Sequence, residues 1–294
     1  MTRLTAIAAI SVLAAALLQG VPQQNELLEV QAVSTNLRYP DGLAWSKAGG
    51  YLVIADSAKK ELYRLDPGAA PKPTHQNTNG VQGVAYDSQD RLYFCEALSR
   101  RLTRLDRNNK LEVLADKFEG KKLNSPNDVV VRKDGQIYFT DPAFAGAVET
   151  RELDFNGIFH VTPKGEVDVV ARWKTRPNGI TLSPDGKILY VSDSDRRAVV
   201  AFDLDKNGLP ANPRDAITKI EGIPGGIRTD VAGNLYVAAL GVGVYTPQGK
   251  KTRTLLIGEP SANLAFGGED LETLYISSRK SVFMVHLEVK GALQ

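Results

Sequence analysis

The sequence contains one cysteine and three histidines in 294 residues. The single cysteine, Cys95, cannot form an internal disulfide, so the fold has to be stable without covalent cross-links. It lies in the apolar stretch LYFCEA, which is typical of a buried strand, and we interpret it as a small core residue. His75, His160 and His286 are scattered along the chain, a pattern that does not favour a zinc site.

The sequence motifs of several common enzyme classes are also absent. There is no G-x-S-x-G nucleophile motif, no H-E-x-x-H zinc motif, no C-x-x-C pair and no Walker phosphate loop. Lysine and arginine number 36 against 34 aspartates and glutamates, and no block of like charge stands out. Because the basic residues are not interleaved with aromatic ones on one face, we expect no nucleic-acid partner.

The first residues are typical of a processing segment. A short basic stretch, MTR, precedes an uninterrupted run of apolar and small residues at Leu4–Leu18, and Gly20 lies near a suitable cleavage point. This pattern predicts a signal peptide over residues 1–20 and an exported protein, either periplasmic or secreted. A retained anchor is the alternative, but the run is short for a spanning helix and no positive flank follows it. We therefore expect no membrane segment in the mature chain.

Six approximate copies of one phrase recur along the rest of the chain. Each copy reads as a short strand, a tight turn such as Asp-Gly, and a second strand with leucine or isoleucine beside an aromatic or aliphatic residue. A third strand follows most of these hairpins. The copies begin at Asp41, Gln82, Asn127, Asn178, Gly225 and Asn263.

Repeats of this length, each with up to four antiparallel strands, are the signature of a propeller. The sequence therefore predicts an all-β fold, a six-bladed β-propeller with a central channel, as a single domain over residues 21–294. No long amphipathic helical pattern follows the signal segment. We expect Leu27–Ser34, which precedes the first repeat, to complete the sheet of the last blade and close the ring.

The innermost strand of each propeller blade begins near the axis, so the six leading residues are expected to converge at one channel mouth. The second strands end beside them, at Asp56, Glu96, Asp141, Asp193, Ala239 and Ser278. Carboxylate and amide oxygens are hard ligands that suit Ca²⁺. We expect Asp56, Asp141 and Asp193 to form a second shell, in which a carboxylate such as Asp141 or Asp193 holds an asparagine amide so that its oxygen faces an ion. The alternative for each polar residue is a simple turn-capping role.

Several of these phrases resemble a known family. KFEGKKLNSPNDVVVRKDGQIYFTDPAF, RPNGITLSPDGKILYVSDS and SANLAFGGEDLETLYISS are similar to the gluconolactonase, senescence-marker-protein and luciferin-regenerating-enzyme family, from about Arg38 to Leu287. The resemblance implies a six-bladed propeller with one divalent cation, usually Ca²⁺, in the channel mouth. It also implies hydrolysis of sugar lactones or related cyclic esters; some relatives hydrolyse organophosphates.

The resemblance also implies roles for individual residues. Asp41 stands where relatives have a metal-binding glutamate, and Asn127 and Asn178 match the amide positions at the ion or substrate. Gly225 stands where relatives have an aspartate that binds the ion and serves as the favoured general base. A second departure is Ala97, where relatives commonly have histidine.

The lost carboxylate at Gly225 removes one ligand and one negative charge, which is expected to weaken cation binding or abolish it. Asp41, Asn127 and Asn178 remain as the predicted metal ligands, with Zn²⁺ and Mn²⁺ as alternatives to Ca²⁺. Asp41 is the remaining candidate base, although one carboxylate is poorly suited to serve as both ligand and base. The predicted substrate-binding residues are Gln82, Asn263 and Glu96.

Two functions remain open from the sequence. The first is an exported metal-dependent hydrolase of the lactonase type with an altered metal site, acting on a small lactone or sugar-like substrate. The second is a non-catalytic or differently catalytic propeller that binds a sugar or a protein partner at the same mouth. Gly225 favours the second, whereas the intact Asn127 and Asn178 positions favour the first. Specificity is expected to come from rim loops such as Ala143–Asp154.

Overall fold

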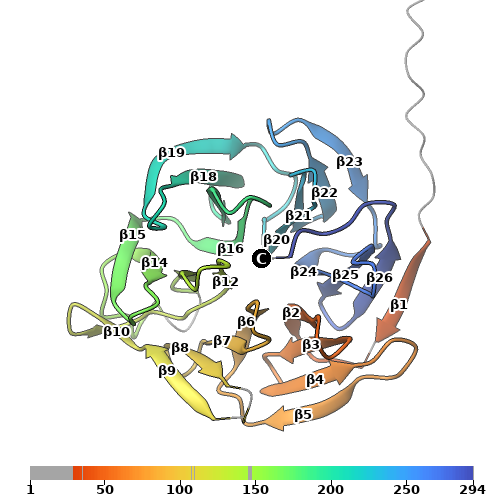
Figure 1. Ribbon diagram of the computed structural model, residues 1–294, viewed down its shortest axis with the longest axis horizontal. Coiled ribbons are helices and arrows are strands. Elements are labelled where there is room, and N and C mark those ends of the chain that lie inside the picture. The colour runs from red at the N-terminus through yellow and green to blue at the C-terminus, as the bar shows by residue number, and fades with distance from the viewer. Residues whose placement is uncertain (1–28, 35, 107, 109, 145–147, 294) are drawn as a thin grey trace, which may run out of the picture.

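The computed structural model describes residues 29–34, 36–106, 108, 110–144 and 148–293. In this part of the chain the strands form six four-stranded antiparallel sheets and one small hairpin. The sheets are arranged around a central axis as the blades of a propeller (Figure 1). The predicted fold class is thereby confirmed. The predicted signal peptide at residues 1–20 lies outside the described residues, and no helix among the described residues is long and apolar enough to cross a membrane.

The strands of each blade are given in order from the innermost to the outermost. Blade one contains β2 (Pro40–Ser46), β3 (Tyr51–Asp56), β4 (Glu61–Leu65) and β5 (Lys72–Gln76). Blade two contains β6 (Val81–Tyr86), β7 (Leu92–Glu96), β8 (Arg101–Leu105) and β9 (Leu111–Ala115). Blade three contains β12 (Val129–Val131), β13 (Ile137–Asp141), β14 (Asn156–Val161) and β15 (Val167–Trp173). The hairpin of β10 (Lys117–Phe118) and β11 (Lys121–Lys122) precedes blade three.

The other three blades follow the same plan. Blade four contains β16 (Pro177–Leu182), β17 (Ile188–Asp193), β18 (Ala198–Leu204) and β19 (Pro210–Ile217). Blade five contains β20 (Ile227–Thr229), β21 (Leu235–Ala239), β22 (Gly241–Tyr245) and β23 (Lys251–Leu255). Blade six contains β24 (Ser261–Gly267), β25 (Thr273–Ser278), β26 (Val282–His286) and, as its outermost strand, β1 (Val30–Ser34).

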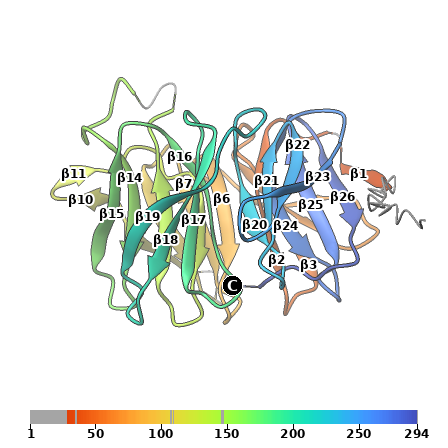
Figure 2. The ribbon, with the colours of Figure 1, turned by 90° about the horizontal axis from the view of Figure 1, so that it is seen from above.

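The ring is closed by strands from opposite ends of the sequence. Strand β1 pairs with β26 in antiparallel fashion, with Val30 opposite Val285 and Gln31 opposite Met284. The expectation that the segment before the first repeat completes the last blade is therefore correct. The described chain ends at the channel itself, opposite the face that carries the loop near residue 148 (Figures 1 and 2).

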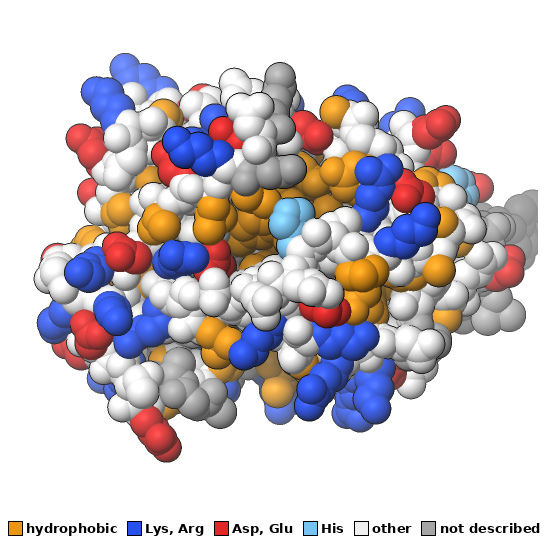
Figure 3. All heavy atoms as spheres, turned by 90° about the horizontal axis from the view of Figure 1, so that it is seen from below, with side chains coloured by type: hydrophobic (Ala, Val, Ile, Leu, Met, Phe, Trp, Pro, Cys, Tyr) orange, Lys and Arg blue, Asp and Glu red, His pale blue; other side chains and the backbone are white. Residues whose placement is uncertain are grey.

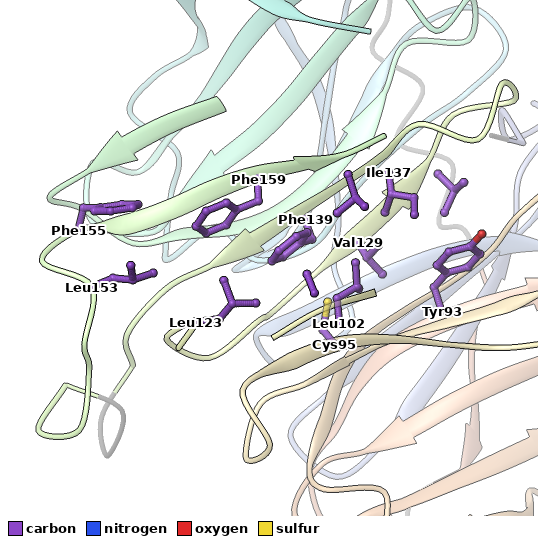
Figure 4. Close-up of a cluster of buried hydrophobic side chains, with 13 residues drawn as sticks. Tyr93, Cys95, Leu102, Leu123, Val129, Ile137, Phe139, Leu153, Phe155 and Phe159 are labelled. Carbon is purple, nitrogen blue, oxygen red and sulfur yellow. The ribbon is translucent and has the colours of Figure 1, made fainter. Parts of the chain in front are cut away.

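The hydrophobic core consists of layers between neighbouring blades. In the largest layer, between blades two and three, Phe139, Phe159 and Leu123 are fully buried together with Cys95 (Figure 4). The burial of Cys95 confirms its assignment to the core. Such layers require apolar residues on both faces of each blade, which explains why the second strands are almost continuously hydrophobic.

A hollow opens at the outer edge between blades one and two. Figure 3 shows this side of the molecule, where apolar side chains line the hollow. The cavity measures about 520 Å³, and His75, Leu62 and Leu92 are among its lining residues. The hydroxyl groups of Tyr51 and Tyr86 meet there at 3.2 Å. Its lining residues do not include the leading residues of the repeats, so we seek the functional site at the channel.

Candidate active site

The leading residues of the repeats lie around the channel because hydrogen bonds join each blade to the next. A main-chain hydrogen bond links blades two and three. Side-chain hydroxyl groups link blade three to blade four and blade six to blade one, at the predicted ligand positions. These bonds run from Gly83 N–H to Asn127 O (2.6 Å), from Thr140 Oγ1 to Asn178 O (2.6 Å) and from Ser277 Oγ to Asp41 O (2.7 Å). The three predicted metal-binding positions are thus built into one ring of strands.

The sixth repeat is one residue out of the register expected from sequence. Ser261 occupies in blade six the pairing position that Pro40 occupies in blade one, opposite the end of the second strand. Ala262, rather than Asn263, therefore corresponds to Asp41. The next pair follows at the same interval in both blades, at Leu43 and at Leu264, so PDGL and SANL align without a gap and the prediction placed the start of the sixth repeat one residue too late.

Asn263 instead corresponds to a buried carboxylate, Asp128, that the sequence analysis did not single out. Both side chains accept a hydrogen bond from the next residue, Asp128 Oδ1 from Val129 N–H at 3.0 Å and Asn263 Oδ1 from Leu264 N–H at 2.8 Å. Asp128 is fully buried, and its second oxygen accepts the Ile180 N–H at 3.3 Å. It follows Asn127 directly, so the SPND phrase contributes two polar side chains to the channel.

The amide of Asn178 is oriented by a serine. Its Nδ2 donates to Ser194 Oγ at 3.2 Å, and Ser194 Oγ donates in turn to Pro224 O at 3.1 Å. With the NH₂ group held in this way, the Oδ1 atom of Asn178 is available to a cation or substrate. Asn127 is 9% exposed, and no described residue forms a side-chain hydrogen bond with it.

The outer carboxylates do not hold the asparagine amides as predicted; they bind main-chain N–H groups of the loops that lead into each blade. Asp56 accepts from Arg38, Tyr39 and Lys59, Asp141 from Asn124 and Ser125, and Asp193 from Asp195 and Arg196, as well as from the Thr175 hydroxyl. Loop N–H groups left without partners would be costly in a buried setting, which accounts for these contacts. The carboxylates thus fix the loops that carry the site.

The predicted substrate-binding residues Glu96 and Gln82 differ in whether their side-chain polar atoms already have partners within the protein. The carboxylate of Glu96 is buried and accepts hydrogen bonds from Asn79, Arg101 and Thr103. Its oxygens are therefore already used within blade two. Gln82 is partly exposed at the channel mouth, and its predicted role in substrate binding stays a prediction.

Asp41 has an unusual electrostatic setting. Burial, and secondly the charge of Asp128, raise its pKa from 3.8 to about 7. Burial likewise raises the pKa of Asp128, while the nearby Arg228 guanidinium opposes the rise. Two carboxylates that both resist ionisation in one channel favour the approach of a cation.

The position expected to carry the base is tightly enclosed. A Cβ atom on Gly225 would lie 2.3 Å from the main-chain oxygen of Ala262 in the neighbouring blade. That separation is far below a normal contact, so any side chain at residue 225 requires the main chain to move. Blades five and six therefore approach each other closely at the position where the carboxylate is absent.

Arg228, on the innermost strand of blade five, lies beside Asp128. Its Nη1 lies 3.7 Å from Asp128 Oδ2, so the guanidinium of blade five reaches toward the carboxylate of blade three. Arg228 could have been recognised from the sequence, because it is the only charged residue at its position in the six repeats. In the register of the strands, the equivalent positions of the other blades are Ala44, Ala85, Val130, Thr181 and Ala265, all without charge.

The residues present fit a divalent cation with a reduced set of ligands. Asp41 offers a carboxylate, and Asn127 and Asn178 offer amide oxygens that no described donor engages. These are the oxygen ligands that Ca²⁺ prefers. Gly225 contributes no side chain, so three of the four implied positions can provide a side-chain ligand.

The family profile of the SMP-30/Gluconolactonase/LRE-like region matches residues 39–280. The chain belongs to this family. Within it, the chain is 28% identical over 306 residues to the gluconolactonase of Zymomonas mobilis, covering 92% of this chain and 85% of that protein. It is also 27% identical over 245 residues to the 6-deoxy-6-sulfogluconolactonase of Pseudomonas putida, covering 80% of this chain and 81% of that one.

Solved structures agree with this assignment. The gluconolactonase of Xanthomonas campestris superposes with a TM-score of 0.82 at 27% identity, over 88% of this chain and 89% of that structure. The calcium-binding protein regucalcin of Agrobacterium tumefaciens superposes with a TM-score of 0.77 at 22% identity, over 91% and 96%. The second likeness shows the shared fold.

Proposed function

We propose that the protein is a metal-dependent hydrolase of sugar lactones or related cyclic esters, with its active site at the channel mouth. The observation that carries the proposal is the ring that joins Asp41, Asn127 and Asn178, with amide oxygens available toward the channel. Family membership and lactone-hydrolysing relatives support the reaction class.

A cation, when bound, would polarise the lactone carbonyl and stabilise the negative charge that develops on its oxygen. Ca²⁺ is the favoured ion because all the available ligands are hard oxygens, with Zn²⁺ and Mn²⁺ as alternatives. Asn127 and Asn178 would hold the ion and orient the substrate, and Ser194 would keep the Asn178 oxygen pointing inward.

Asp41 is the group that can accept a proton. Without a cation, burial raises the pKa of Asp41 to about 7, close to the working pH at which a general base is most effective. Asp41 also belongs to the proposed ligand set, and Gly225 supplies no second carboxylate. We therefore assign Asp41 as the base for the attacking water, in place of the aspartate that the family resemblance implies at residue 225.

The second candidate is a propeller that binds a sugar or a protein partner at this mouth without hydrolysing it. The tight packing around Gly225 favours this alternative, since it leaves the mouth one carboxylate short. The two candidates make different predictions for turnover but the same prediction for the position of the ligand.

The deciding experiment is a metal titration of the full chain. After chelation, Ca²⁺, Mn²⁺ or Zn²⁺ is added while the melting temperature and glucono-1,5-lactone hydrolysis are measured together. We expect one ion to raise both. If none of the three ions changes either quantity, the metal-dependent hydrolase is excluded.

The site is tested by Asn178→Ala, which we expect to abolish lactone hydrolysis. The matched control is Asn207→Ala, because Asn207 is exposed on the turn between β18 and β19. Equal activity in both variants would mean that the site lies elsewhere.

We further propose that the protein is exported, to the periplasm or beyond, after removal of residues 1–20. The proposal rests on the signal-like sequence. N-terminal sequencing of protein expressed from the full gene tests it, with a mature terminus near residue 21 expected and an intact Met1 as the opposing result.

A further inference from the structure

A second cavity lies in the channel on the side opposite the candidate active site. It measures about 610 Å³, within the range of about 300–1,000 Å³ typical of ligand pockets. Apolar side chains form most of its wall, among them Leu43, Val84, Val129, Ile180, Phe266 and Trp45. None of the predicted metal ligands Asp41, Asn127 and Asn178 lines it.

The end of the described chain forms part of the wall. Ala292 and Leu293 line the cavity, and the Ala292 N–H donates to Thr229 O at 2.9 Å. Gly291 packs against Phe266, where an added Cβ would lie 2.1 Å from the ring. The C-terminal segment is thus fixed across the far mouth (Figure 1).

Arg228 supplies a positive charge in this apolar surrounding. Its side chain is 18% exposed and belongs to the cavity lining. A guanidinium has five N–H donors, yet Arg228 donates one short hydrogen bond within the described chain, to Ile227 O at 2.6 Å. At 3.7 Å its approach to Asp128 is an ion pair too long for a good hydrogen bond. Most donors of a largely buried cation are therefore available to a ligand.

Charged residues at the rim of the cavity also favour an anionic ligand. Lys47 and Lys133 both line the cavity, and neither forms an ion pair with a described residue. Of the two rim carboxylates, Asp87 is paired with Arg91 at 2.6 Å, and Asp90 accepts a hydrogen bond from a serine hydroxyl. Ammonium groups at the rim and a guanidinium inside suit a negatively charged ligand.

We propose that this cavity binds a carboxylate with an extended apolar body, with the anionic group on Arg228 and the hydrocarbon part along the apolar wall. A neutral apolar molecule would leave the guanidinium donors unpaired, and a cation would be repelled by Arg228. Arginine binds carboxylates through two parallel N–H bonds, which fixes the head group. This is a binding site distinct from the lactone site, and it does not depend on turnover.

The first test compares head groups on the unchanged protein. Decanoate, decanol and decyltrimethylammonium share a ten-carbon chain, and calorimetry measures the binding of each. We expect decanoate to bind at least tenfold more tightly than the other two, because only its carboxylate can accept charge-assisted hydrogen bonds from Arg228. Equal binding of decanol, tighter binding of the cation, or no decanoate binding would each overturn the proposal.

Trp45 offers an optical signal at the site. It lines the cavity, whereas the other tryptophan, Trp173, stacks on Phe202 in the outer part of blades three and four. Decanoate is expected to change the fluorescence of the parent and of Trp173→Phe but not of Trp45→Phe. A signal that disappears only with Trp173→Phe would place the ligand elsewhere.

The variant that tests the anion contact is Arg228→Gln, with Arg253→Gln on the exposed outer strand β23 as the matched control. We expect Arg228→Gln to weaken decanoate binding at least tenfold and the control to leave it unchanged. Unchanged affinity in Arg228→Gln would overturn the assignment. If Arg228→Gln does not fold, the head-group comparison decides alone.

Discussion

Ser194 Oγ accepts a hydrogen bond from the side-chain amide of Asn178 at 3.2 Å and donates its own hydrogen bond to Pro224 O at 3.1 Å. Ser194 is therefore the positioning residue for the proposed ligand oxygen. We predict that Ser194→Ala weakens cation binding about tenfold, since loss of a contact that orients a ligand typically costs that much. Calorimetric titration with Ca²⁺ measures it. The exposed Ser88→Ala is the control, and equal affinities would show that the amide needs no support.

The contact between Arg228 and Asp128 leads to a prediction about stability. The Asp128 side chain is only 1% exposed, so replacing the arginine leaves a buried carboxylate without its cation. We predict that Arg228→Met lowers the free energy of unfolding by about 3 kcal/mol at pH 8. Denaturant unfolding measures the change, with Arg253→Met as control. The loss is expected to shrink as pH falls, because burial raises the pKa of Asp128 and a protonated carboxyl needs no cation; a loss that does not vary with pH would contradict this.

The close approach of blades five and six makes Gly225 intolerant of side chains. We predict that Gly225→Ala lowers the free energy of unfolding by about 1–3 kcal/mol, the usual cost of overpacking, because its Cβ would meet Ala262 O at 2.3 Å. Gly225→Asp is expected to lose stability as well, so it does not simply restore a ligand.

The control for that substitution is Gly165→Ala. Gly165 has a φ of +85° but nothing within 4 Å of an added Cβ. Its cost is therefore conformational alone, about 1 kcal/mol. A Gly225→Ala protein as stable as the parent would show that the blades separate easily.

The raised pKa of Asp41 predicts how stability depends on pH without metal. Between about pH 4 and pH 7 the native protein keeps a proton on Asp41 that the unfolded chain releases, since the pKa rises from 3.8 to about 7 on folding. Stability therefore falls as pH rises through this window. We predict a lower melting temperature at pH 8 than at pH 5 after chelation, and a weaker dependence in Asp41→Asn.

Part of the dependence should remain in that variant, because burial also raises the pKa of Asp141 to about 7. Adding Ca²⁺ at pH 8 is expected to raise the melting temperature of the parent and not of Asp41→Asn. Identical pH profiles for the two proteins would show that Asp41 ionises normally.

Most of the fold could be predicted because the repeat is a local signal. Each hairpin joins strands that are neighbours in sequence, so apolar alternation and Asp-Gly turns indicated six blades. The closure by β1 was predicted by the same logic, since a blade needs its fourth strand. The register of the sixth repeat was predicted wrongly, because Asn263 was taken as the leading polar residue although Ala262 holds the position of Asp41.

The site was predicted less completely, for a different physical reason. Asn127 and Asn178 are recognisable from their own phrases, but their partners lie on other strands. The role of Arg228 depends on a contact between blades, and that of Ser194 on a contact between the ends of two strands of blade four; neither contact can be read from the sequence. The outer carboxylates were predicted to bind asparagine amides, but they bind loop N–H groups. The sequence does not show which N–H groups lie near these oxygens.

The pairing of Val30 with Val285 sets an order for assembly. Strand β1 is synthesised long before its partner β26, so the sheet of blade six cannot be completed until most of the chain has been made. Cleavage near Gly20 would keep β1 intact, whereas a protease cut a few residues beyond Val30 would separate the final blade from its outermost strand.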